Sequence, residues 1–217
     1  MLYLKYSVLT WRSRAKRLGG LVFAALVATL LTGCSGGDEK SVATDRAIAD
    51  AGFYREWDWF KGTYWIVPPN GIYSTYQIAR DNSFVVTRGQ TVFSITDYFN
   101  GYFTGAVVVK ITETQVTSCQ FVLGQVTPEG QVFMTMFNAN TGTVNNYPIG
   151  TMVLEGGQWT MVNEMTSPAQ GGTLSHWAYM IQSKPGDGFY EHLPFVNESI
   201  PDFLSSCPAG PMLIRTP

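Results

Sequence analysis

The sequence has few residues of the types that build catalytic and metal centres. It contains only two histidines, His176 and His192, and three cysteines. No Cys-x-x-Cys pair or cysteine–histidine cluster marks a metal site. No serine-hydrolase, zinc-protease, phosphate-loop or dinucleotide fingerprint occurs. The sequence therefore predicts no metal ion and no cofactor, and no spacing singles out a catalytic residue.

Acidic residues are absent from the first 33 positions, which carry five of the 14 basic residues. The apolar run at 20–31 is about 12 residues long, and a helix of that length rises roughly 18 Å. The hydrocarbon core of a bilayer is roughly 30 Å thick, so this run is too short to span it. A basic start, a short apolar run and small residues at the end are typical of an export signal. We therefore expect residues 1–33 to be a signal peptide.

The end of this segment, Leu31-Thr32-Gly33-Cys34, resembles the lipobox of bacterial lipoproteins. The resemblance covers these four residues. It implies a diacylglyceryl thioether on Cys34, cleavage before Cys34 and attachment to the membrane through several acyl chains, which suffices for stable anchoring. In Gram-negative lipoproteins an aspartate after the cysteine favours the inner membrane, so Ser35 predicts the outer membrane facing the periplasm. The alternative is an ordinary signal peptide with a free thiol at Cys34.

The exported part of the chain is acidic. Removal of 33 of the 217 residues leaves 184, which suits one domain with its own core. Nine basic residues then stand against 16 acidic ones, a formal charge of −7. This charge disfavours nucleic acid and anionic lipid head groups as partners. We expect a signal peptide at 1–33, a flexible polar tether at 34–43, a β domain at 44–183 and an irregular, proline-rich tail at 184–217.

Aromatic and β-branched residues recur with a period of two, which is typical of half-buried strands. The clearest strand is 102–112, where Phe103, Val107 and Ile111 share an apolar face. Similar patterns predict strands at 62–67, 72–78, 83–87, 91–98, 116–126, 131–137, 150–154, 158–165 and 174–182. One short N-terminal helix is expected at 41–51.

Turn signals separate these strands. Asn100-Gly101 is the pair preferred by type I′ hairpins, and Asp81-Asn82, Pro128-Glu129-Gly130 and Gly156-Gly157 are compatible with tight reversals. Short links make consecutive strands antiparallel neighbours. The sequence therefore predicts an all-β antiparallel meander. An up-and-down barrel, which removes exposed edges, is favoured over a β-sandwich.

Two short segments resemble segments of the lipocalins. Residues 60–65, FKGTYW, resemble the Gly-x-Trp segment that opens their first strand, and residues 96–98, TDY, resemble their Thr-Asp-Tyr segment. This resemblance implies a calycin-like barrel.

Two cysteines remain in the exported chain, Cys119 and Cys207. The compartment outside the cytoplasm is oxidising, so we expect them to form a disulfide. The alternative is two separate thiols, one buried in a strand and one in the tail.

The strand at 174–182 carries His176, which shares a face with Ala178 and Met180. Histidine transfers protons near neutral pH. Glu164, in the preceding strand, is its candidate partner, and these two are the candidate catalytic residues. The favoured alternative is a hydrogen-bonded, inert histidine within the sheet.

Aromatic and methionine side chains supply candidate ligand contacts. The aromatic candidates are Trp65, Tyr98, Trp177 and Tyr179, because aromatic rings line pockets for apolar ligands. Met134, Met136, Met161 and Met165 suit an adaptable apolar cavity. For both sets, packing in the core is the favoured interpretation.

Three functions remain open. The first is binding of a small apolar or amphipathic ligand by a membrane-anchored envelope protein. The second is a structural or protein-interaction role in the envelope. The third is a barrel enzyme, a lyase, isomerase or hydrolase that uses His176 with Glu164. No motif encodes the ligand, the reaction or the oligomeric state.

Overall fold

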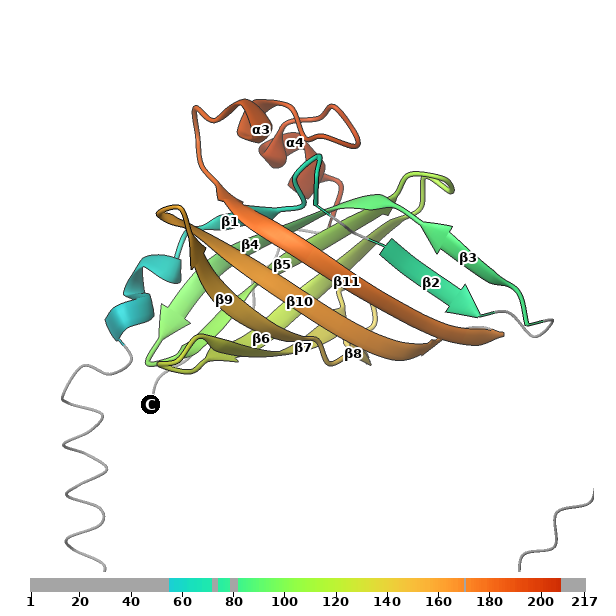
Figure 1. Ribbon diagram of the computed structural model, residues 1–217, viewed down its shortest axis with the longest axis horizontal. Helices are drawn as coiled ribbons and strands as arrows, with labels where there is room; N and C mark the ends of the chain where they lie inside the picture. Colours follow the sequence, from blue (N-terminus) through green and yellow to red (C-terminus); the bar gives the residue numbers. More distant parts are fainter. Residues whose placement is uncertain (1–54, 72–73, 79–81, 170, 208–217) are drawn as a thin grey trace, which may run out of the picture. The chain divides into compact units, whose positions relative to one another are not determined.

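A computed structural model gives the structure of residues 55–71, 74–78, 82–169 and 171–207 (Figure 1). The expected helix at 41–51, the tether and the lipidation site lie outside these described residues. The strands are β1 (Tyr64–Ile66), β2 (Ser74–Ile78), β3 (Phe84–Thr87), β4 (Gly89–Phe99), β5 (Tyr102–Ile111), β6 (Thr117–Val126), β7 (Gln131–Asn138), β8 (Val144–Asn146), β9 (Ile149–Glu155), β10 (Gln158–Ala169) and β11 (Gly172–Ser183). The helices are the 3-10 helix η1 (Arg55–Phe60) and the α-helices α3 (Gly188–Glu191) and α4 (Ile200–Ser205).

The strands form a closed, antiparallel, up-and-down barrel. Its order is β1-β4-β5-β6-β7-β9-β10-β11, and β11 returns to pair with β1. The other half of β11 pairs with β2, and β3 leads directly into β4, so β2 and β3 prolong the wall beyond β1. The short β8 pairs with β7. The prediction of an all-β, calycin-like barrel is confirmed, and the sandwich alternative is excluded.

Alternate side chains of each strand point into the barrel. In β5 the inner face carries Phe103, Val107 and Val109, as the period of two predicts. Val107 lies opposite Phe93 of β4, and Phe103 lies opposite Gly124 of β6. A Cβ atom at position 124 would lie 2.1 Å from the Phe103 ring, so glycine is required there.

The hairpin turns follow the sequence signals. Asn100 and Gly101 have φ values of 47° and 86°, and Gly156 and Gly157 have 57° and 82°. Two successive positive φ angles are characteristic of the type I′ turn, whose twist matches that of the flanking strands. The hydroxyl oxygen of Tyr98 accepts the backbone N–H of Gly101 at 3.0 Å and secures the first of these turns.

One end of the barrel is filled by aromatic rings from η1 and the adjoining strands. Trp57 and Phe60 of η1 are buried, and the Trp57 indole N–H donates to the Thr127 carbonyl at 3.0 Å. The Trp57 ring centroid lies 5.0 Å from that of Trp159, and Phe60 lies 5.0 Å from Phe103. These edge-on contacts fill the barrel at this end with aromatic rings.

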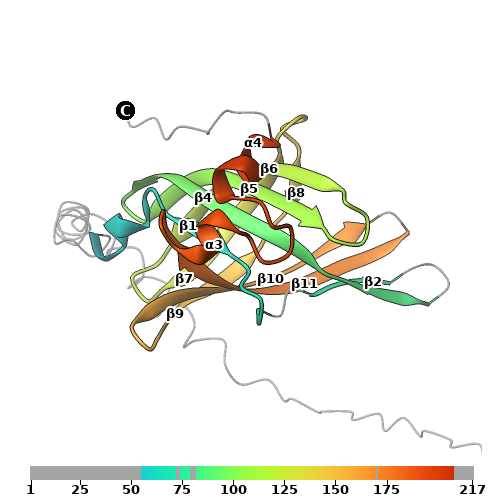
Figure 2. The same cartoon turned by 90° about the horizontal axis from the view of Figure 1, so that it is seen from above.

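The helices α3 and α4 cover part of the outer wall, over β1, β4 and β5 (Figure 2). Ile66, Val92 and Val108 point outward and pack against Leu193, Ile200 and Phe203 from the C-terminal segment. Lys110 and Glu198 form an ion pair at 2.8 Å across the same contact. The tail expected to be irregular thus contains two short helical turns where it meets this apolar face. Among the described helices, none has the length and apolarity needed to cross a bilayer.

The predicted disulfide between Cys119 and Cys207 is confirmed. It joins the outer face of β6 to the residues that follow α4, and their Cα atoms are 5.5 Å apart. The bond closes a segment of 88 residues, and a loop of that size restricts the unfolded chain strongly.

Replacing both cysteines, Cys119→Ser with Cys207→Ser, should lower the free energy of unfolding by about 2–4 kcal/mol. Urea unfolding followed by tryptophan fluorescence measures the difference. Reductant should lower the stability of the wild-type protein and leave the double variant unchanged. An equal free energy of unfolding for the oxidised wild-type protein and the double variant would contradict the structural role of the bond.

Candidate functional site

The end of the barrel opposite η1 is open and holds a cavity of about 340 Å³. This volume falls at the lower end of the range of small-molecule sites, which is about 300–1,000 Å³. We call this space the mouth cavity. Its lining comes from β5, β6, β8, β10 and β11 and consists of Val109, Ile111, Ser118, Gln120, Asn145, Asn146, Met165, Ser167, Pro168, Leu174 and His176.

A smaller space, the inner chamber, lies deeper in the barrel and has a volume of about 20 Å³. It shares Val109, Gln120, Asn146, Met165 and His176 with the mouth cavity, so the two spaces adjoin. Its remaining lining residues are Thr91, Phe93, Val107, Met136, Pro148, Asn163 and Ala178. The chamber therefore combines an apolar wall with a few buried polar groups, as ligand sites commonly do.

Strand alternation brings Asn163 into the barrel. It follows Trp159 and Met161 on the inward face of β10, and Met165 comes next on that face. The cross-strand partner of Asn163 is Gly150 of β9. A Cβ atom on residue 150 would lie 2.5 Å from the Asn163 side-chain oxygen. Glycine at position 150 thus provides the space for this amide.

His176 points into the barrel, opposite Met165 of β10. Burial lowers the pKa of His176 from 6.5 to about 4, so its imidazole is neutral at pH 7. Among the described residues that line the two spaces, none carries a charge at that pH. The mouth therefore presents neutral polar groups on an apolar wall.

The catalytic pair proposed from the sequence is not assembled. Glu164 is the register partner of Trp177, and both lie on the outer face of the sheet, where Glu164 is exposed. His176 lies on the inner face, because neighbouring residues of a strand point to opposite sides. The register therefore points the two side chains to opposite faces of the sheet, although both residues border the shallow depression at this edge of the barrel. Their joint catalytic role stays a prediction.

The aromatic candidates do not line the mouth cavity either. Trp65 is fully buried at the η1 end, where its indole N–H donates to the Thr63 hydroxyl at 3.0 Å, and Tyr98 supports the Asn100-Gly101 turn. Trp177 borders a shallow depression on the outside. Tyr179 also faces outward, where burial and its hydrogen bond to Glu155 raise the pKa of its phenol. The structure therefore does not bring these four residues together at one cavity, and Trp65 and Tyr98 fit the favoured interpretation of packing.

Sequence reasoning missed the polar residues of the inner chamber. Thr91, Gln120, Asn146 and Asn163 each occur once within an otherwise apolar strand face or a short strand. A signal was present for Asn163, which interrupts the apolar inward series Trp159, Met161 and Met165. Of the four methionines, Met136 and Met165 line the chamber, whereas Met134 and Met161 pack in the core.

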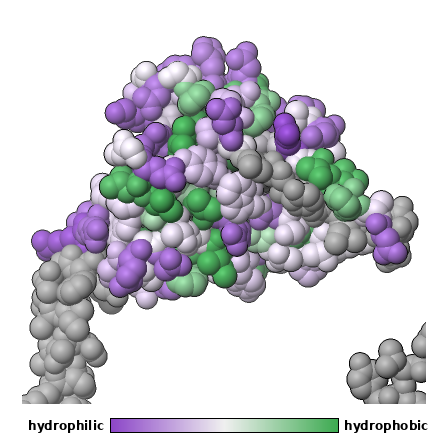
Figure 3. Space-filling view, in the orientation of Figure 1, coloured by the Kyte–Doolittle hydropathy of each residue, from purple (hydrophilic) through white to green (hydrophobic). Residues whose placement is uncertain are grey.

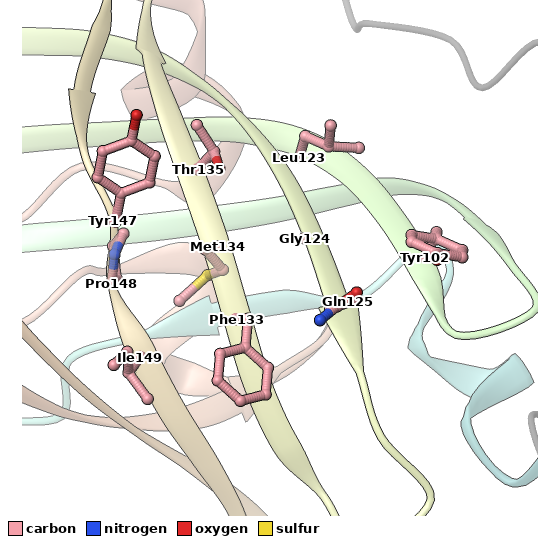
Figure 4. Close-up of a pocket in the computed structure, with 10 residues that line it drawn as sticks. All are labelled: Tyr102, Leu123, Gly124, Gln125, Phe133, Met134, Thr135, Tyr147, Pro148 and Ile149. Carbon is pink, nitrogen blue, oxygen red and sulfur yellow. The ribbon is translucent and has the colours of Figure 1, made fainter. Parts of the chain in front are cut away.

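A second hollow lies on the outer wall of β5, β6, β7 and β9 (Figure 4). This outer groove has a volume of about 410 Å³ and carries exposed apolar side chains, namely Tyr102, Leu123, Phe133, Tyr147 and Ile149. Other exposed apolar residues, Phe84, Val85 and Val86, lie on β3, at the end where Figure 3 shows hydrophobic side chains. Apolar surface of this kind suits protein contacts.

Comparisons with protein-family models, with curated proteins and with solved structures found no match. Within the described part of the chain, no group of three or more histidine, cysteine or acidic residues could hold a metal ion.

The buried His176 should make stability depend on pH. The unfolded chain binds a proton at this histidine below pH 6.5, whereas the folded protein binds it only near pH 4. Stability contributed by the neutral imidazole is therefore lost as the pH falls from 6.5 to 4. The loss should be about 1–3 kcal/mol, with allowance for solvent access at the mouth.

Urea unfolding at a series of pH values measures this loss. His176→Gln should have a flatter profile than the wild-type protein between pH 6.5 and 4. His192→Gln, which changes the other histidine, is the matched control variant. If the free energy of unfolding falls equally in the wild-type protein and in His176→Gln between pH 6.5 and 4, the burial of this histidine does not control acid stability.

Proposed function

We propose that this chain is a membrane-anchored envelope lipoprotein whose barrel binds a small apolar or amphipathic ligand in the mouth cavity. The observation that carries the proposal is the contrast between the two ends of the barrel. At the η1 end, tryptophan and phenylalanine rings fill the interior. At the other end, the cavity of about 340 Å³ remains between β5, β6, β10 and β11.

The lining of the mouth suits such a ligand. Val109, Ile111 and Leu174 offer apolar contact, and burial of apolar surface contributes about 25 cal/mol per Å² before the costs of binding. Met165 adds a side chain that adapts to different shapes. Ser118 and Ser167 supply hydroxyl groups at the same opening.

Three features of the sequence support the envelope location. The basic and apolar segment at 1–33 is typical of an export signal, and residues 31–34 resemble a lipobox with Cys34 as the acylated residue. A disulfide between Cys119 and Cys207 suits an oxidising compartment.

A tryptophan placed in the mouth should displace the ligand. Ser118 is half-buried on the inner face of β6, and Ser118→Trp fills the cavity with an indole ring. Full-length protein is purified from its host membranes, and bound organic molecules are extracted and quantified by mass spectrometry. We expect a molecule present at about one per wild-type protein and reduced about tenfold or more in Ser118→Trp.

The matched control is Thr117→Trp. Thr117 is the preceding residue of β6 and is exposed on the outer face, so the same ring is added outside the barrel. This variant should retain the molecule. Equal retention by both variants, or no stoichiometric molecule in the wild-type protein, would contradict ligand binding in the mouth.

The outer groove favours a second function, contact with a protein of the envelope. Phe133→Ser combined with Tyr147→Ser removes two exposed rings from the groove (Figure 4). If the groove binds a protein, crosslinking in cells should trap a specific partner of the wild-type chain and lose it in this variant. Retention of the same partner by the variant would exclude the groove as its binding surface.

A further inference from the structure

Four buried polar atoms at the inner chamber have no hydrogen-bond partner among the described residues. They are Thr91 Oγ1, Gln120 Oε1, Asn146 Oδ1 and Asn163 Oδ1. The four residues are only 4%, 9%, 7% and 2% exposed, and they come from β4, β6, β8 and β10. Buried polar atoms normally have partners, and each one left unsatisfied costs about 1–3 kcal/mol. Their convergence on one space points to a group that enters it and satisfies them.

The chemistry of these atoms defines that group. The amide oxygens of Gln120, Asn146 and Asn163 only accept hydrogen bonds, and the Thr91 hydroxyl can also accept one. The Asn163 amide nitrogen contacts Met180 Sδ at 3.4 Å, and the Gln120 amide nitrogen donates to the Ser118 hydroxyl at 3.4 Å. Both contacts occupy the nitrogen side of the amide, so the amide oxygens remain without a partner among the described residues. The entering group must therefore donate hydrogen bonds.

The electrostatics of the chamber exclude a charged group. The described lining residues carry neither a carboxylate nor an ammonium or guanidinium group. A carboxylate or an ammonium ion buried there would lose its hydration without gaining a counter-charge, which is strongly unfavourable. An uncharged donor, such as a hydroxyl or a primary amide, meets the same acceptors without that penalty.

We propose that the barrel selects an uncharged amphiphile that inserts a hydrogen-bond-donating end into the inner chamber. This inference rests on the proposed function and names its ligand class. The chamber, at about 20 Å³, admits one small group, since a cavity of roughly 10–15 Å³ already holds a water molecule. The apolar body of the ligand then lies in the mouth cavity against Val109, Met165 and Leu174.

Four probes with matched chains separate the possibilities. Octan-1-ol is a neutral donor, and its isomer 1-methoxyheptane has the same atoms but no donor. Octanoate and octylammonium carry opposite charges on chains of equal length. Binding of each radiolabelled probe to the full-length protein in phosphatidylcholine nanodiscs is measured by equilibrium dialysis, and empty nanodiscs correct for partitioning into lipid.

Octan-1-ol should bind at one site per protein and about tenfold tighter than the other three probes, because it alone is neutral and donates a hydrogen bond to a chamber oxygen. Equal affinity for octan-1-ol and 1-methoxyheptane would overturn the donor requirement. Tighter binding of either ion would overturn the requirement for an uncharged end. In either of these two outcomes, loss of probe binding in Ser118→Trp would still support the proposed function, ligand binding in the mouth cavity. If none of the probes binds above the empty nanodiscs, the proposed function fails as well.

Two variants test the acceptors themselves. Thr91→Val replaces a buried hydroxyl with a methyl group at nearly constant volume. Asn163→Leu replaces the whole buried amide with a larger apolar group. Each should weaken octan-1-ol binding about tenfold and change 1-methoxyheptane binding less than about twofold. Thr91→Val should also raise the melting temperature of the ligand-free protein, because an unsatisfied polar atom is removed at nearly constant volume.

A lower melting temperature in both variants, with octan-1-ol binding unchanged, would assign these oxygens to the fold and overturn the proposal. A higher melting temperature with unchanged octan-1-ol binding would mean that ordered water alone satisfies them, which also overturns it. Thr91→Val makes the smaller change of shape. If Asn163→Leu fails to fold, the result for Thr91→Val alone decides between these outcomes.

Discussion

Closure of the barrel depends on three residues, Tyr64–Ile66, which form the strand β1. Ile66 pairs with Ile181 of β11 on one edge and with Val92 of β4 on the other. Without these pairs both neighbouring strands would expose an edge, which invites association with other chains. Closure also defines an inside, and an eight-stranded barrel has an interior that side chains can just fill. The functional question is therefore where this chain fills the interior and where it does not.

The two ends of the barrel answer that question differently. At the η1 end, Trp57 and Phe60 enter from outside the sheet and meet Trp65, so the interior there is apolar and packed. At the mouth, positions that could carry leucine or phenylalanine carry Gln120 and Asn163 instead. These residues lower stability when their oxygens lack partners. Several such losses gathered around one cavity are the pattern expected where a protein binds something.

The sequence predicted the backbone of the fold better than the site. The period of two at 102–112 and the Asn100-Gly101 pair predicted β5 and its turn, because both signals are local. Which face of the sheet His176 and Glu164 point to is not determined by local sequence signals. It depends on the register between β10 and β11, in which a shift by one residue would move Glu164 to the inside. Likewise, Gln120 and Asn146 meet only because β6 and β8 both flank β7 in the closed barrel.

The disulfide connects the C-terminal segment that packs on the outer wall to the strand β6, which lines the mouth cavity. Cys119 lies on β6 between Ser118 and Gln120, which both line the mouth from the opposite face of that strand. The bond to Cys207 ties this part of β6 to α4, whose Ile200 and Phe203 are fixed by packing on β4 and β5. A strand restrained on its outer face has less freedom to change the positions of its inner side chains. A ligand that meets groups already in place loses less entropy on binding. If the mouth binds the proposed ligand, the covalent link and the helices therefore favour tighter binding, although neither touches the cavity.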